Sequence, residues 1–272
     1  EKTNAKIEVF LLRELNKEDC IWDVIVDPAR KVRIGNKIYF DDNLWCEIID
    51  NTTSRGRTVR FNQPGKVFQM VEKIGLTPLP PYIKRDPEPS DKQNYQTVYA
   101  KVDGSVAAPT AGLHFTEKLL AKIEKKGIHI VPVILHIGLG TFRPVEVEDL
   151  TKHRMDSEYY EIPEKSAEII NKALREKNNV FVVGTSTCRA LETSTTAEGF
   201  VKPARGWTDK FIYPPYTFRV TQKLITNFHA SESTLLLLVA AFAGTDLIMK
   251  AYKHALKNKY RFLSYGDAML IL

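Results

Sequence analysis

Short segments in which β-branched or aromatic residues alternate with charged ones fill the first 62 residues of the chain. Such alternation is typical of half-buried strands. Turn-forming pairs separate the segments, and Gly35-Asn36 between two of them favours a tight hairpin. The expected strands are residues 7–13, 21–26, 32–34, 37–40, 44–49 and 58–61. Many short strands at close spacing predict a small antiparallel β-barrel or sandwich that forms a separate domain.

The pattern changes after residue 62. Residues 67–74 have the spacing of one short helix that ends before Gly75. A proline-rich stretch follows over 77–91. Because proline fixes φ and lacks a backbone donor, we expect this stretch to be extended connecting chain. We therefore predict a small domain over residues 1–74 and a larger one over residues 75–272.

Helical and strand patterns alternate from about residue 95 to the end of the chain. Apolar residues recur at helical spacing after Phe115 and in three later segments, 166–177, 233–243 and 247–256. Apolar runs at 128–135 and 180–183 have the length of buried strands. Strands that alternate with helices in this way predict a largely parallel sheet or barrel.

Composition and charge narrow the class of protein. The chain has 272 residues, of which 43% are apolar and 26% charged, values ordinary for a soluble globular protein. A mild net charge of +6 permits a polyanionic partner without requiring one. The longest apolar run, 235–243, is far shorter than the ~20 residues that cross a bilayer. Three cysteines without CxxC spacing, and no visible signal peptide, favour the cytoplasm.

Two loops have the residue types that hold ligands in α/β proteins, where binding loops follow the C-terminal ends of parallel strands. Residues 136–142 follow one expected strand, and residues 184–189 follow another and lead into a helix. Small residues let the backbone approach a ligand, and a helix start offers free N–H donors to an anion. Turn geometry explains the glycines of the first loop equally well. A capped helix start with a surface arginine explains the second.

Two histidines and one carboxylate are candidates for proton transfer. His114 ends a run of small residues beside an expected helix start, and His229 precedes the helix at 233–243. A hydrogen-bonded structural histidine explains each of them as well. Asp267 lies in the aromatic C-terminal segment, which is also typical of a plain terminal strand. No group of histidines, cysteines and carboxylates has metal-ligand spacing, so we expect no metal.

Taken together, seven runs resemble, in order and spacing, the S-adenosylmethionine:tRNA ribosyltransferase-isomerase family of queuosine biosynthesis. The runs are 107–116, 136–145, 153–161, 184–192, 211–216, 225–244 and 260–271. Residues 1–74 agree with the family only in pattern. The sequence departs from the family at Ala230-Ser231, where Leu-Pro is usual, at Asp156, where His is common, and at Pro215, where Gly is frequent. The sequence begins at Glu1 without the family's usual N-terminal segment, so we expect the main domain to lack it.

The resemblance implies an α/β barrel-like main domain with a small inserted antiparallel β-barrel domain. It implies an enzyme that transfers and isomerises the ribosyl group of S-adenosylmethionine onto 7-aminomethyl-7-deazaguanine at the tRNA wobble position. The products are epoxyqueuosine-tRNA, adenine and methionine, and the enzyme is expected to be a monomer without a metal. His114, His229 and Asp267 are then the catalytic candidates. The residues expected to hold substrate are Thr110, Gly112, Gly138, Gly140, Thr141, Phe142, Thr185, Ser186, Thr187, Arg189, Glu192 and Tyr265.

A basic stretch over residues 202–223 is the expected tRNA surface. Lys202, Arg205, Lys210 and Arg219 are the candidates for phosphate contacts, although a solvated loop has the same composition. Two other functions fit the sequence. One is a non-catalytic tRNA-binding remnant of the family, and the other is an unrelated α/β enzyme acting on a sugar phosphate.

Overall fold

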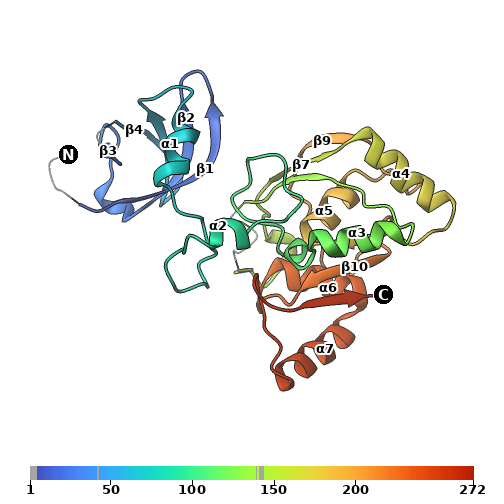
Figure 1. Cartoon of the computed structure of the whole chain (residues 1–272). Coiled ribbons are helices and arrows are strands. Elements are labelled where there is room, and N and C mark those ends of the chain that lie inside the picture. The colour runs from blue at the N-terminus through green and yellow to red at the C-terminus, as the bar shows by residue number, and fades with distance from the viewer. Residues whose placement is uncertain (1–4, 42, 139, 141–143) are drawn as a thin grey trace. The chain divides into compact units, whose positions relative to one another are not determined.

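The computed structural model describes residues 5–41, 43–138, 140 and 144–272. The chain divides into two compact units, residues 1–78 and residues 79–272, and Figure 1 labels most of their helices and strands. Each unit is built around its own cluster of buried apolar side chains.

A five-stranded antiparallel sheet makes up the first unit, in the order β1-β2-β5-β4-β3. Side chains of β2 alternate between buried and half-buried positions, and Trp22, Val24 and Val26 enter the core, against which Val67 of helix α1 is buried. The strands are β1 (Glu8–Asn16), β2 (Ile21–Asp27), β3 (Lys37–Tyr39), β4 (Trp45–Asn51) and β5 (Gly56–Phe61), followed by α1 (Val67–Ile74). The predicted antiparallel pairing of these strands and the helix after them are therefore confirmed.

Two details of the prediction for the first unit are not confirmed. β1 and β3 are the outer strands of the sheet and do not pair, so the predicted barrel is not closed within the described residues. The strand expected at 32–34 is wrong, because these residues follow a 3₁₀ turn, η1 (Ala29–Lys31), and enter another turn. In that second turn, the side-chain oxygen of Asn36 accepts a hydrogen bond from the backbone of Arg33 at 2.9 Å.

Two three-stranded sheets form the second unit, in the orders β11-β10-β8 and β6-β7-β9. Only β8 and β10 pair in parallel among the described strands, and every other pairing is antiparallel. The strands are β6 (Ile134–His136), β7 (Glu158–Ile162), β8 (Phe181–Val183), β9 (Ala204–Thr208), β10 (Lys223–Asn227) and β11 (Ala268–Ile271). The largely parallel sheet is therefore a wrong prediction, and the barrel-like main domain is not confirmed.

Helices separate these strands along the chain, and most follow the predicted segments. α6 and α7 meet at Gly244, whose positive φ of 87° ends one helix and begins the next. The hydroxyls of Thr116 and Ser233 cap α3 and α6. The helices are α2 (Asp91–Asn94), α3 (Glu117–Lys125), α4 (Glu164–Arg175), α5 (Thr185–Thr193), α6 (Thr234–Ala243) and α7 (Thr245–Lys257), with 3₁₀ turns η2 (Thr110–His114) and η4 (Leu150–Lys152).

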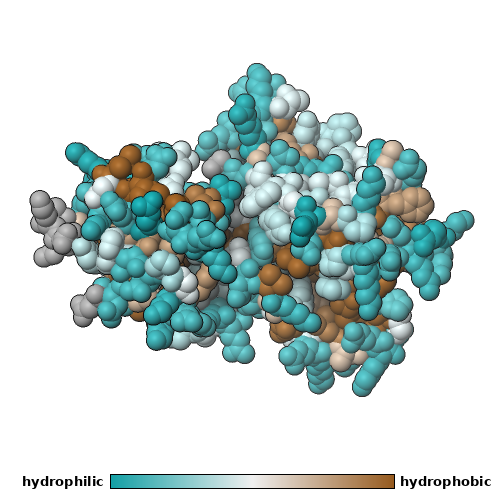
Figure 2. Space-filling view, turned by 90° about the horizontal axis from the view of Figure 1, so that it is seen from above, coloured by the Kyte–Doolittle hydropathy of each residue, from teal (hydrophilic) through white to brown (hydrophobic). Residues whose placement is uncertain are grey.

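The surface is mostly hydrophilic on the face that Figure 2 shows, with smaller hydrophobic patches between charged side chains. Within the described residues, no single helix is long and apolar enough to cross a bilayer. α6 and α7 meet that length and composition only as a pair, and they are bent by 116°. Leu238 and Val239 of α6 are buried in the core of the second unit.

Candidate active site

A cavity lies where the two parallel strands of the second unit end. β8 runs into Gly184 and the start of α5, and β10 ends at Asn227, so both C-terminal strand ends border the same space. This is the position where open α/β sheets bind ligands. We call it the inner cavity, and its lining includes Thr110, Ala111, Gly184, Thr185, Ser186, Thr187, Thr226, Asn227, His229 and Ser264.

The start of α5 supplies hydrogen-bond donors to the inner cavity. Gly184 is the N-cap, with φ 91° and ψ 145°, and its carbonyl accepts the first helical bond from the backbone of Cys188 at 3.1 Å. The backbone N–H groups of Thr185, Ser186 and Thr187 therefore have no acceptor within the helix. A helix start of this kind favours an anionic ligand group. The structure brings these three predicted residues together at the cavity wall.

His229 lies at the same cavity as a neutral ring. It is buried, and burial lowers the pKa of its imidazole to about 3. Its Nε2 lies 3.0 Å from the Thr226 hydroxyl, and its backbone N–H donates to the Tyr252 hydroxyl at 2.8 Å. At neutral pH the imidazole can donate one hydrogen bond and accept another, but it lacks the second ring proton that an imidazolium would donate as an acid.

Asn227 connects the inner cavity to the second predicted histidine. The Thr110 hydroxyl donates to Asn227 Oδ1 at 3.2 Å, and Asn227 Nδ2 donates to the Leu263 carbonyl at 3.2 Å. The same Nδ2 lies 3.4 Å from Nε2 of His114. Asn227 is only 2% exposed, whereas His114 is exposed. The buried amide thus fixes the position of an accessible imidazole.

His114 borders a second, larger space of about 490 Å³, which we call the outer cavity. Its lining consists of Arg85, Glu88, Ser90, Asp91, Asn94, Leu113, His114, Arg261, Ser264, Tyr265 and Gly266. Tyr265, a predicted substrate residue, donates its hydroxyl to Asp91 Oδ1 at 2.8 Å, and burial together with this bond raises the pKa of its phenol to about 12. Ser264 lines both cavities, so the two spaces are neighbours.

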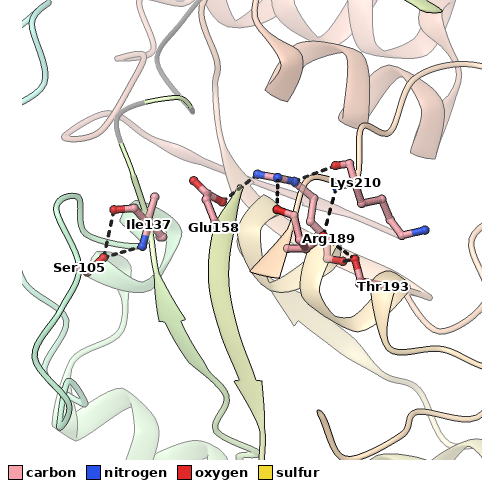
Figure 3. Close-up of polar contacts among 7 residues, drawn as sticks. Ser105, Ile137, Glu158, Arg189, Thr193 and Lys210 are labelled. Atoms are coloured by element: carbon pink, nitrogen blue, oxygen red, sulfur yellow. Dashed lines mark hydrogen bonds and ion pairs between the residues drawn. The ribbon is translucent and has the colours of Figure 1, made fainter. Parts of the chain in front are cut away.

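Arg189 and Glu192 have partners inside the protein rather than at either cavity. Arg189 is 3% exposed, and its guanidinium bonds Glu158 at 2.8 Å, as Figure 3 shows, and the backbone carbonyls of Lys210 and Thr208. The Glu192 carboxylate is 4% exposed and accepts backbone N–H groups from residues 219–221 at 3.0 to 3.3 Å. Both side chains hold neighbouring loops against α5.

Asp267, the third catalytic candidate, is also engaged by its own loop. Its Oδ2 accepts from the Arg261 backbone at 2.7 Å, and its Oδ1 accepts from the Arg261 guanidinium at 3.1 Å. These bonds hold the pKa of the Asp267 carboxyl below its usual range. Asp267 is not among the residues that line the two cavities.

The three predicted glycines are not among the residues that line the two cavities, and two of them, Gly112 and Gly140, have close neighbours. A side chain at Gly112 would collide with the Tyr99 hydroxyl, and one at Gly140 would collide with the Asp156 carboxylate. Gly138 has open space around it. Near this loop, the Ser105 hydroxyl accepts from the Ile137 backbone at 2.8 Å (Figure 3). Thr141 and Phe142, also predicted to hold substrate, lie outside the described residues.

The predicted tRNA contacts differ in exposure. Lys202, Arg205 and Arg219 are exposed. Lys210 is half-buried, and its ammonium lies 5.7 Å from the centre of the Tyr216 ring. The exposed three are therefore better placed to meet a polyanion than Lys210 is.

The cysteines and carboxylates of the described chain do not assemble a metal centre. Within residues 5–41, 43–138, 140 and 144–272, no group of three or more His, Cys, Asp or Glu has the geometry to hold an ion. Cys188, next to the predicted loop, is fully buried, and burial raises the pKa of its thiol to about 12.

Sequence reasoning missed the residues that organise the two cavities, chiefly Asn227, Ser264, Asp91 and Arg85. One signal points to Asn227: it ends a strand that pairs in parallel with β8, and so it lies at the same end of the sheet as residues 184–189. Asp91 and Arg85 lie in the proline-rich stretch, for which the sequence predicts only extended connecting chain.

Comparison with known proteins identifies what the chain is similar to. It matches the family described as "Queuosine biosynthesis protein" over residues 1–271. It is 62% identical over 273 residues to S-adenosylmethionine:tRNA ribosyltransferase-isomerase of Chloroherpeton thalassium and 56% identical over 276 residues to that of Cytophaga hutchinsonii. Each match covers 100% of this chain and 79% of the relative. The crystal structure of S-adenosylmethionine tRNA ribosyltransferase from Thermotoga maritima is 32% identical, with a TM-score of 0.49, and the match covers 98% of this chain and 75% of that one.

Proposed function

The chain belongs to the queuosine biosynthesis protein family, and from this membership we propose that it is an S-adenosylmethionine:tRNA ribosyltransferase-isomerase. The observation that carries the proposal is 62% identity along the whole chain to a relative of that name. The reaction moves the ribosyl group of S-adenosylmethionine to the aminomethyl nitrogen of 7-aminomethyl-7-deazaguanine in tRNA. The ribosyl unit rearranges to the epoxycyclopentane of epoxyqueuosine, and adenine and methionine are released.

The inner cavity suits the donor. S-adenosylmethionine ends in a carboxylate, and the free N–H groups of Thr185, Ser186 and Thr187 are donors aimed at an anion. Thr110 and His229 add a hydroxyl and a neutral imidazole to the same wall. We therefore assign the carboxylate of the donor to the start of α5.

The chemistry requires proton transfers, and His114 is the better-placed histidine for them. The sulfonium acidifies the neighbouring C5′ hydrogens, so a base must remove one, and the departing adenine must gain a proton. Burial opposes a positive charge on His229, whereas His114 is exposed and borders the outer cavity. We propose His114 as the acid/base residue and His229 as a neutral hydrogen-bonding group of the donor site.

Lys202, Arg205 and Arg219 are proposed to contact tRNA phosphates, because their charged groups are exposed. Replacing each by glutamine should weaken tRNA binding and reduce the slope of log affinity against log salt by somewhat less than one per lost contact. A slope unchanged in all three variants would place the tRNA elsewhere on the protein.

We propose further that the enzyme works as a monomer in the cytoplasm and needs no metal. Turnover should survive exhaustive chelation, and sedimentation should give the mass of one chain. Activity that is lost on chelation and restored by a metal ion would contradict the last point.

The decisive experiment incubates the protein with S-adenosylmethionine and tRNA carrying the modified base, and follows adenine by mass spectrometry. We expect adenine release that depends on that tRNA and is absent with tRNA carrying guanine at the wobble position. Binding of tRNA without adenine release would overturn the enzymatic proposal in favour of a binding protein. Turnover of a sugar phosphate without tRNA would overturn it in favour of a different enzyme.

A further inference from the structure

A buried carboxylate, Asp91, is part of the lining of the outer cavity. Asp91 is only 1% exposed and accepts two bonds from the Arg85 guanidinium, at 2.6 and 2.8 Å. It also accepts the backbone N–H of Glu88 at 2.8 Å and the Tyr265 hydroxyl at 2.8 Å. The Arg85 bonds hold the pKa of the Asp91 carboxyl well below its usual range, so the carboxylate stays charged and keeps its partners. One buried carboxylate thus orders both Arg85 and Tyr265.

These two ordered side chains offer flat surfaces at the wall of the cavity. The Tyr265 ring also packs against the Tyr95 ring in a T-shaped arrangement, at a centroid distance of 5.7 Å. Tyr265 is 37% exposed, and the side chain of Arg85 is 40% exposed. Aromatic rings and guanidinium planes are the groups on which proteins stack unpaired nucleobases. The cavity volume of about 490 Å³ also lies within the range of roughly 300–1,000 Å³ typical of small-molecule sites.

Glu88 supplies the acceptor that a guanine-like base needs. Its side chain is exposed at the cavity, and among the described residues only the Ser90 hydroxyl donates to its carboxylate, at a long 3.4 Å. The pairing edge of a 7-deazaguanine carries a ring N–H and an amino group side by side, and both are donors. A carboxylate can accept both at once, and extruded bases are read by hydrogen bonds to this edge.

Because the outer cavity adjoins the inner one, it is suited to bind the second substrate of the transfer reaction. Asn227 lines the inner cavity and contacts His114, which lines the outer one, and Ser264 belongs to both. A transfer reaction needs its two substrates within about 3–3.5 Å at the reacting atoms. A base that is part of a tRNA must enter from an open side, and Arg85, Glu88, Ser90, Asn94 and Arg261 at the outer cavity are all exposed.

We propose that the outer cavity binds the 7-aminomethyl-7-deazaguanine base of the tRNA, stacked against Tyr265 and Arg85, and that Glu88 accepts hydrogen bonds from its pairing edge. This assignment rests on the proposed function and adds the site of the acceptor to it. Glu88 is then the residue that determines which base is accepted.

The test compares equilibrium binding of two tRNAs, one with the modified base and one with an abasic wobble position, so that the contribution of the base is separated from that of the backbone. In Glu88→Gln, preference for the base-containing tRNA should fall about 10- to 100-fold, since a charged acceptor is lost. Binding of S-adenosylmethionine should stay within about twofold of the wild type. The matched control is Glu168→Gln, an exposed carboxylate of α4 that lines neither cavity.

A second variant, Asn94→Trp, places a bulky side chain at the rim and should reduce the same preference without affecting S-adenosylmethionine. Melting curves confirm that each variant is folded. The assignment would be overturned if both variants kept the wild-type preference for the base-containing tRNA. It would also be overturned if they lost S-adenosylmethionine binding while that preference stayed the same. Because these are binding measurements, they remain informative even if the wild type releases no adenine, the outcome that contradicts the proposed function itself.

Discussion

Asn227 determines which nitrogen of His114 carries its proton. Nδ2 of Asn227 lies 3.2 Å from the Leu263 carbonyl, which can only accept, so this atom is the amide nitrogen. The Thr110 hydroxyl completes the pattern by donating to Oδ1 at 3.2 Å. The second proton of Nδ2 therefore points to Nε2 of His114, 3.4 Å away, which must accept. In the neutral ring the proton is then on Nδ1.

Replacing Asn227 should change this tautomer and slow the reaction. In Asn227→Ala the donor facing Nε2 is gone, so the Nδ1–H form loses its preference. Long-range ¹H–¹⁵N spectra of the neutral imidazole should show Nδ1–H in the wild type and a mixture in the variant. With His114 proposed as the acid/base residue, adenine release at saturating substrate should fall on the order of 10- to 100-fold. Thr110→Val, which leaves the Nδ2 contacts in place, is the control and should keep the wild-type tautomer. The same tautomer in both variants would contradict this role of Asn227.

Arg189 should matter for stability rather than for substrate affinity. It forms a buried ion pair with Glu158, in which the two side chains are 3% and 7% exposed. Arg189→Met leaves a buried carboxylate without its cation, and loss of one partner of such a pair costs about 3–5 kcal/mol in the free energy of unfolding. Arg219→Met is the control, because the guanidinium of Arg219 is exposed and donates to the Thr196 carbonyl at 3.0 Å, so the cost should stay below about 1 kcal/mol. Denaturant unfolding measures both. A stable Arg189→Met protein with weakened S-adenosylmethionine binding would restore the substrate-binding role predicted from the sequence.

His229 should make the protein less stable in mild acid. Its pKa of about 3 in the folded protein lies below the value of about 6.5 expected in the unfolded chain. Between these two values the unfolded chain binds the extra proton, so stability falls as the pH falls through this window, by up to about 1.4 kcal/mol per pH unit. His229→Gln should flatten that dependence, whereas His254→Gln, an exposed histidine of α7, should not. The measurement is the free energy of unfolding of the wild type and the two variants between pH 7 and pH 4. If this free energy changed with pH equally in all three proteins, burial would not be holding His229 neutral.

The helices could be predicted from the sequence because their signals are local. Apolar spacing predicts α1, α3, α4, α6 and α7, and hydroxyl caps also mark the starts of α3 and α6. Strand pairing has no such local signal. Helix α4 directly follows β7, as a helix does when it connects two parallel strands. The partners of β7 are nevertheless β6 and β9, and β9 comes after both α4 and α5 in the chain. The order of elements therefore did not reveal that most pairings are antiparallel.

The candidate site could be predicted only in part for a similar reason. Residues 184–187 were identified because a strand-to-helix turn of small and hydroxyl residues has a local physical meaning. The sequence associates Arg189 and Glu192 with them only through their proximity along the chain. Once α5 begins at Thr185, however, both lie in later turns and are buried. A polar residue that fixes a loop and one that binds a ligand have the same composition, and only their partners, Glu158 for Arg189 and the backbone of residues 219–221 for Glu192, distinguish them.

Gly184 should be required for donor binding beyond its effect on stability. Its φ of 91° and ψ of 145° are close to those of Gly244, 87° and 139°, and side chains rarely adopt this conformation. An alanine at Gly184 would meet only ordinary contacts, at 3.8 Å or more, so the cost is conformational and about 1–3 kcal/mol. Gly244→Ala should cost a similar amount, because it has the same geometry and no atom within 4 Å. Only Gly184→Ala moves the N–H groups at the start of α5, so calorimetric titration should show weaker S-adenosylmethionine binding in that variant alone. Equal affinities in the two variants would mean that the start of α5 does not hold the donor.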